Sequence, residues 1–162
     1  MAKHVLGFDC SSKAVHMVQL DMSTGDIVRM EKWTNPSRDM EQRFNLVMDD
    51  FEEWFNKWSA KKKFLAAEYV SVIENPIYVN NIKATVGITN VIAGVKRHLW
   101  KSGIDYWARD NRVWKKLVLG SGAANKEEIM NWAKSKWGDK FPEQDWADAA
   151  CIAMYRIMFE KL

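Results

Sequence analysis

Two apolar runs in this sequence each end in a carboxylate. Asp9 closes the run that begins at Val5 and is followed by small residues, and Glu74 closes the run that begins at Tyr69. A short apolar run bounded by small or helix-breaking residues is typical of a buried strand, in which a carboxylate is costly unless a positive charge neutralises it. We therefore expect Asp9 and Glu74 to bind a cation. The alternative for Asp9 is a turn-capping role at the end of its strand.

A second pair of acids, Asp145 and Asp148, lies near the C-terminus. Residues three apart share one face of a helix, so both side chains can point at one spot. Acids in a first helical turn are also favoured by the helix dipole, which is the purely structural explanation for this pair. One strand–helix–strand crossover would place the strands that end in Asp9 and Glu74 side by side. The four carboxylates would then form an oxygen cage suited to Mg²⁺ or Mn²⁺. Two such ions about 4 Å apart can activate a water and stabilise the leaving oxygen of a phosphodiester.

The rest of the chain supplies the elements that must position these acids. Apolar or alternating runs between turn residues predict strands, and apolar residues at three- and four-residue steps predict helices. The expected strands cover residues 5–9, 15–21, 27–33, 69–74 and 104–108, and the expected helices cover residues 38–58, 78–101, 126–137 and 144–160. Residues 109–116 are expected to form a basic segment, and residues 119–126 a flexible loop. This order predicts one α/β domain over residues 1–162, with a five-stranded mixed sheet (three antiparallel strands, then two parallel ones) flanked by helices.

Composition narrows the class of protein. With 48% hydrophobic and 28% charged residues among 162, the chain is globular, and most of its 9 Trp are expected in the core. We find no stretch long enough to span a membrane and no secretory pattern, so no membrane partner is expected. Cys10 and Cys151 are isolated, which favours a reducing compartment. His4, His16 and His98 are scattered and form no zinc signature.

The expected helix at 78–101 carries two apolar stripes, and Gly87 and Gly94 would allow another element to approach it closely. The stripes consist of Ile82, Val86, Thr89 and Ala93, and of Ile88, Ile92, Val95 and Leu99. A helix that is apolar on two sides is either deeply buried or covers the sheet with one face and a partner with the other. The helix is therefore a candidate homodimer surface.

The order of these elements resembles the RNase H-like fold of the RuvC family of Holliday-junction resolvases, over most of the chain. The most specific parts are Gly7-Phe8-Asp9, Ile73-Glu74 before a helix with Asn80 and Gly87, and the run from Lys115 to Lys126 before Asp145-Trp146-Ala147-Asp148-Ala149-Ala150. The sequence departs from the family pattern after Glu74, where Asn75 replaces a Gln and no Phe follows two residues later. Ile77 or Tyr78 would have to probe the junction instead. Trp146 also replaces an Ala between the two acids.

The resemblance implies a dimeric endonuclease that makes paired nicks in four-way DNA junctions, using two Mg²⁺ ions for which Mn²⁺ substitutes. It implies that Asp9, Glu74, Asp145 and Asp148 are the catalytic metal ligands. Lys126 would be a further catalytic residue at the scissile DNA, and Lys115 would contact the same phosphate region. The expected DNA-binding residues are Tyr78, Arg109, Arg112, Lys115, Lys116 and Lys126. Trp114 is expected either to stack on unpaired bases or to pack in the core. The expected setting is the cytoplasm of a bacterial cell or of a phage-infected host.

Three alternatives remain at this stage. The nearest is a related nuclease that acts on other branched DNA, on flaps or on RNA–DNA hybrids. A protein that binds junctions without cutting them is disfavoured by the presence of all four acids. The third is a phosphotransferase, because the run Gly7–Lys13 also resembles the phosphate-binding hairpin of the actin and sugar-kinase group. That group needs two such domains, and 162 residues supply one.

Overall fold

The computed structural model describes residues 1–76, 78 and 80–162. Its elements are β1 (His4–Cys10), β2 (Ala14–Asp21), β3 (Ile27–Thr34), α1 (Met40–Ser59), a 3₁₀ turn (Ala66–Glu68), β4 (Tyr69–Glu74), α2 (Ile82–Lys101), β5 (Asp105–Arg109), α3 (Asn111–Leu119), α4 (Lys126–Trp137) and α5 (Gln144–Glu160). All five expected strands are present. Among the described residues, no helix combines the length and the apolar character that crossing a membrane requires.

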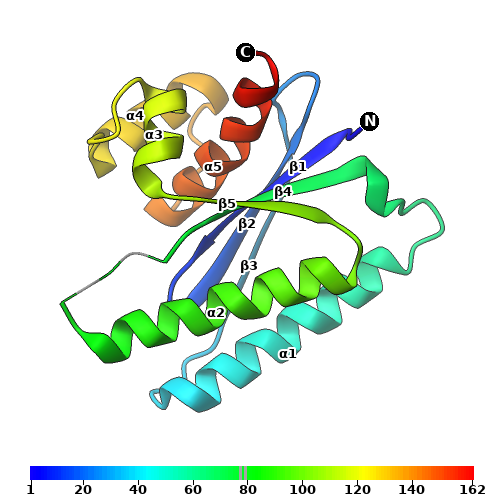
Figure 1. Cartoon of the computed structure of the whole chain (residues 1–162), viewed down its shortest axis with the longest axis vertical. Coiled ribbons are helices and arrows are strands. Elements are labelled where there is room, and N and C mark those ends of the chain that lie inside the picture. Colours follow the sequence, from blue (N-terminus) through cyan, green and yellow to red (C-terminus); the bar gives the residue numbers. More distant parts are fainter. Residues whose placement is uncertain (77, 79) are drawn as a thin grey trace.

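The five strands form one mixed sheet in the order β3-β2-β1-β4-β5 (Figure 1). The first three strands pair antiparallel, whereas β4 pairs parallel with both β1 and β5. Phe8 lies opposite Ile73 in the β1–β4 register, so the next residues, Asp9 and Glu74, reach the same edge of the sheet. The predicted fold class and the predicted pairing of these two strands are confirmed.

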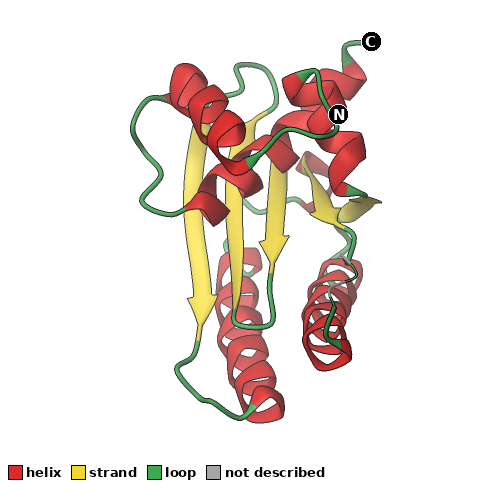
Figure 2. Ribbon diagram, turned by 90° about the vertical axis from the view of Figure 1, so that its left-hand side faces the viewer, coloured by secondary structure: helices red, strands yellow, loops and turns green. Residues whose placement is uncertain are grey.

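The sheet is covered on both faces (Figures 1 and 2). Side chains alternate between the faces along a strand. Leu6 and Phe8 therefore pack in the core beneath α1 and α2, while Val5 packs in the core beneath α3, α4 and α5. Because Asp9 lies an even number of residues after Val5, its carboxylate projects from the same face of the sheet, which α5 covers.

Gly7 allows α5 to lie directly on β1. A Cβ atom at Gly7 would collide with the backbone oxygen of Ala149 and would lie 2.6 Å from the backbone nitrogen of Ala153. Small side chains on α5 complete this close contact, and Ala149 and Ala153 are fully buried. The contact matters for function because it holds the first turn of α5 near the end of β1.

Two helical segments differ from the predictions. The segment expected to be merely basic forms α3, because Trp114 and Val118 are buried one turn apart and Gly120, with φ of +85°, ends the helix. The long helix begins at Ile82 rather than at residue 78, because the Asn81 side chain caps it by accepting a hydrogen bond from the Ala84 backbone.

The tryptophans mostly pack inside the protein, as predicted. All nine lie in the described part of the chain, and Trp100 alone is exposed. Trp33, Trp54 and Trp58 belong to an aromatic cluster around α1, in which the Trp33 ring meets the edge of the Phe51 ring at 4.8 Å between centroids.

Candidate metal centre

The fold brings the ends of three elements to one place on the α5 face of the sheet. Asp9 comes from the end of β1, Glu74 from the end of β4, Asp145 from the first turn of α5, and Asp148 from the start of its second turn. The electrostatics of Asp9 reflect this meeting. Burial raises its pKa well above the usual 3.8, and the charges of Asp148 and Glu74 raise it further, followed by that of Asp145. The four acids predicted from the sequence therefore interact with one another.

Glu74 is held by a buried indole. Burial raises its pKa from 4.5 to about 7. The Trp114 Nε1–H donates a hydrogen bond of 2.6 Å to Glu74 Oε2 and opposes this rise. Trp114 was predicted either to stack on unpaired bases or to pack in the core. It is 1% exposed and packs in the core, which confirms the second prediction.

Asp148 has a partner on its own helix. The Gln144 Nε2–H donates to Asp148 Oδ1 at 3.0 Å. Burial raises the pKa of Asp148, while this hydrogen bond and then the charges of Lys115 and Lys126 lower it. The two lysines predicted to serve the site thus lie near enough to act on one of its carboxylates.

His16 also belongs to this cluster, although its position in the sequence, far from the other two histidines, predicted no metal site for it. In the β1–β2 hairpin His16 lies opposite Asp9, so both side chains project from the same face. One ligand atom each from His16, Asp9 and Asp145 fall within 4.8 Å of one another. The short connection between the two strands was the available signal, because a hairpin turn determines which residues face each other.

These residues fit a divalent cation. Burial, and then repulsion from neighbouring carboxylates, raises the pKa values of Asp9 and Glu74, and a bound cation would oppose both effects. The ring of His16 is 2% exposed, its Nε2 has no hydrogen-bond partner among the described residues, and its Nδ1 lies 4.0 Å from Asp145 Oδ2, on the side of the acids. Burial lowers the pKa of His16, which favours the neutral imidazole that ligates metals.

The other predicted DNA-binding residues have different surroundings. Arg112 and Lys116 are exposed on α3, and Tyr78 is exposed before α2. The Arg109 guanidinium instead stacks over Trp107, at 4.6 Å to the ring centroid, and donates to Tyr155 Oη at 3.1 Å. Ile77, the other predicted junction probe, lies outside the described residues.

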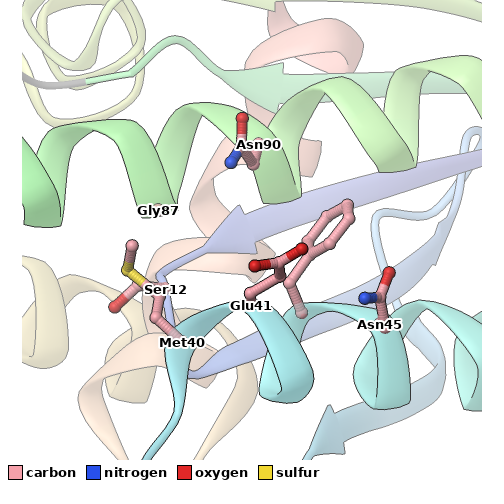
Figure 3. A pocket seen from close by; sticks show the side chains of 7 residues that line it. Ser12, Met40, Glu41, Asn45, Gly87 and Asn90 are labelled. Atoms are coloured by element: carbon pink, nitrogen blue, oxygen red, sulfur yellow. The ribbon is translucent and has the colours of Figure 1, made fainter.

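A separate hollow of about 380 Å³ lies between α1 and α2, on the opposite face of the sheet (Figure 3). Its lining consists of Ser12, Met40, Glu41, Phe44, Asn45, Gly87 and Asn90. Gly87 allows the two helices to approach here, since a Cβ atom would lie 2.6 Å from Met40 Sδ. Glu41 is the one ionisable side chain in this lining, so the carboxylate cluster is the better candidate site.

The mixed sheet with this strand order, covered by helices on both faces, defines an RNase H-like fold. No family model matches the sequence, and neither does any curated protein. Among solved structures, the chain is similar to Thermus thermophilus RuvC in complex with a Holliday junction substrate, with 15% identity and a TM-score of 0.76 over 98% of this chain and 95% of that one. A second T. thermophilus RuvC structure gives 15% identity and a TM-score of 0.74 over the same shares of both chains. The predicted likeness to RuvC is confirmed at the level of the fold.

Proposed function

We propose that this protein is a metal-dependent endonuclease that resolves four-way DNA junctions by paired nicks. The observation that carries the proposal is the convergence of four carboxylates from β1, β4 and α5 at one end of the sheet. The likeness to a RuvC structure that holds a Holliday junction substrate supports the choice of DNA as substrate. The proposed setting is the cytoplasm of a bacterial cell or of a phage-infected host.

Each acid has a role that follows from its position. Asp9 and Asp148 are the first choice as direct ligands of divalent ions, and Glu74 and Asp145 complete the set. Two bound Mg²⁺ or Mn²⁺ ions would supply an activated water and would stabilise the leaving oxygen of the phosphodiester. The hydrogen bonds from Trp114 and Gln144 keep single carboxylate oxygens of Glu74 and Asp148 pointed in fixed directions.

The lysines near the acids would bind the DNA strand. The charges of Lys115 and Lys126 lower the pKa of Asp148, so their positive field extends to the metal centre and would attract a phosphate there. A lysine is a point charge that can offset negative charge developing on a reacting phosphate. Exposed Arg112 and Lys116 on α3 would extend this positive surface to neighbouring phosphates without reading sequence.

A four-way junction needs two nicks on opposing strands, so two active sites related by a two-fold axis would suit it. Of the two apolar stripes on α2, the one containing Ile92 and Val95 is buried against the sheet. The other stripe faces outward, with Ile82 76% and Val86 46% exposed. Trp100 is 66% exposed and lies on the same side of α2 by helical spacing, so it extends this outer stripe toward the end of the helix. We propose this outer stripe as the homodimer surface.

The deciding experiment is cleavage of a synthetic four-way junction in Mg²⁺ or Mn²⁺, beside linear duplex, flap and RNA–DNA hybrid substrates. Paired symmetric nicks that disappear in Asp9→Asn and Asp148→Asn, but persist in the exposed α1 control Asp50→Asn, would support the proposal. Tight binding without nicks in either metal would indicate a junction-binding protein. Preferential cutting of flaps or hybrids would contradict the substrate assignment.

The dimer has its own test. Val86→Lys should convert the protein to a monomer in sedimentation velocity and uncouple the two nicks. Val28→Lys, an equally exposed apolar position on β3, should leave the sedimentation coefficient unchanged. A wild-type protein that sediments as a monomer at micromolar concentration would refute the dimer.

A further inference from the structure

His16 is placed like a metal ligand, yet the four-acid scheme gives it no role. Its Nδ1 lies 4.0 Å from Asp145 Oδ2, and both residues belong to the group with Asp9 described above. With metal–ligand bonds of about 2.1 Å, two donor atoms of one ion are about 3 to 4 Å apart, so this separation leaves room for a cation bound to both. The His16 ring is almost completely buried, so its position depends little on solvent.

The other ring nitrogen faces a different carboxylate. His16 Nε2 lies 3.7 Å from Glu143 Oε2, too far for a hydrogen bond but close enough for a small adjustment to make one. The second oxygen of Glu143 is held by Lys32 Nζ at 2.8 Å. Metal-ligating histidines commonly donate their second N–H to a carboxylate, which determines which nitrogen is left to bind the metal. Here Glu143 would retain the proton on Nε2 and leave the Nδ1 lone pair directed at Asp145.

Trp146 holds the ring in this orientation. The His16 and Trp146 rings meet edge to face, at 90° and with 4.8 Å between centroids. Trp146 lies directly after Asp145 on α5. The helix that carries Asp145 therefore also supplies a ring contact that orients His16.

The geometry points to His16 as a further metal ligand, which joins Asp9 and Asp145 at one ion and makes the site selective for Mn²⁺ and similar transition ions over Mg²⁺. Imidazole nitrogen binds transition metals well, whereas Mg²⁺ strongly prefers oxygen ligands. This inference deepens the proposed function, since it concerns the ions on which that function depends. Its test measures metal binding and does not require DNA cleavage.

The test measures metal binding to the protein without DNA, by calorimetry with Mn²⁺ or Mg²⁺ at about pH 7.5. His16→Phe removes both nitrogens and keeps an aromatic ring against Trp146. We expect it to lower Mn²⁺ affinity at least tenfold and Mg²⁺ affinity much less, so that the ratio of the two affinities falls. His98→Phe is the matched control, because His98 is also buried, with its ring at a steep angle to Phe51 and Phe55, but lies on α2 away from the four acids of the metal centre. It should leave both affinities unchanged.

A measurement on the wild-type protein covers the case in which His16→Phe does not fold. Binding of Zn²⁺, a diamagnetic probe, should shift the ¹⁵N resonance of His16 Nδ1, assigned with variants that lack His4 or His98. Glu143→Gln, a change at a half-exposed side chain, should weaken Mn²⁺ binding about tenfold. An unshifted His16 resonance at saturating Zn²⁺, or an unchanged Mn²⁺ to Mg²⁺ ratio in folded His16→Phe, would overturn the inference. Junction cleavage does not enter either readout, so failure of the proposed function would be seen separately.

Discussion

Replacing Trp114 by Phe should weaken metal binding at a site that Trp114 itself does not enter. The change removes the 2.6 Å hydrogen bond from the indole N–H to Glu74 Oε2 and leaves that oxygen without its donor. A buried hydrogen bond to a charged group is worth about 1.5–3 kcal/mol, and its loss falls on the ionised form of Glu74. Because a metal binds the ionised carboxylate, this energy corresponds to roughly a 10- to 100-fold loss of affinity.

The pH dependence of that loss identifies its cause. The pKa of Glu74 is already about 7, and without the indole it would rise further. Calorimetric Mn²⁺ titrations between about pH 6 and pH 9 should therefore show the largest deficit at the acidic end. The deficit should shrink as the pH rises, because the carboxylate then ionises without help.

Trp137→Phe provides the control for losing a buried tryptophan. Its indole N–H also donates a hydrogen bond, of 2.8 Å, but to the backbone oxygen of Gly25, away from the acids. This variant should be destabilised and should still bind Mn²⁺ normally. If Trp114→Phe bound Mn²⁺ as tightly as the wild type across the whole pH range, the hydrogen bond would have no role in holding Glu74 ready for metal.

Three further predictions concern the same acids and the helix that carries two of them. Asp9→Asn should abolish cleavage and yet raise the melting temperature of the metal-free protein near pH 7.5. The change removes a carboxylate whose ionised form is disfavoured by burial and by repulsion from the other acids, so a lower melting temperature would contradict this reasoning. The folded protein keeps the Glu74 proton up to about pH 7, whereas the unfolded chain loses it near pH 4.5. The free energy of unfolding of the metal-free protein should therefore fall by roughly 3 kcal/mol between these pH values because of Glu74, and this contribution should stay constant above pH 7. Denaturant unfolding of the wild type and of Glu74→Gln should show this fall in the wild type and a smaller one in the variant. Gly7→Ala should lower the free energy of unfolding by about 1–3 kcal/mol and reduce Mn²⁺ affinity, because a Cβ atom there pushes α5 away from β1. Unaltered metal binding would mean that the positions of the acids do not depend on this contact.

Local patterns in the sequence were sufficient to predict the architecture and to predict that these four acids lie near one another. Strand and helix periodicities depend on neighbouring residues, so all five strands and four of the five α-helices were predicted. Asp145 and Asp148 share a helix face by their spacing alone. Asp9 and Glu74 were recognisable because a carboxylate at the end of an apolar strand needs a partner. α3 escaped prediction because its buried face consists of only two residues, Trp114 and Val118, in a segment rich in basic side chains.

The partners of the acids were decided by the tertiary structure. His16 meets Asp145 only because the hairpin register places it on the α5 face, and because Gly7 lets α5 come close to β1. Trp114 reaches Glu74 from a helix 40 residues further along the chain. Such contacts depend on how remote elements pack in three dimensions, and that packing leaves no periodic trace in the sequence. The sequence by itself therefore determined which residues carry the negative charge, and the tertiary structure determined which neighbours hold and direct them.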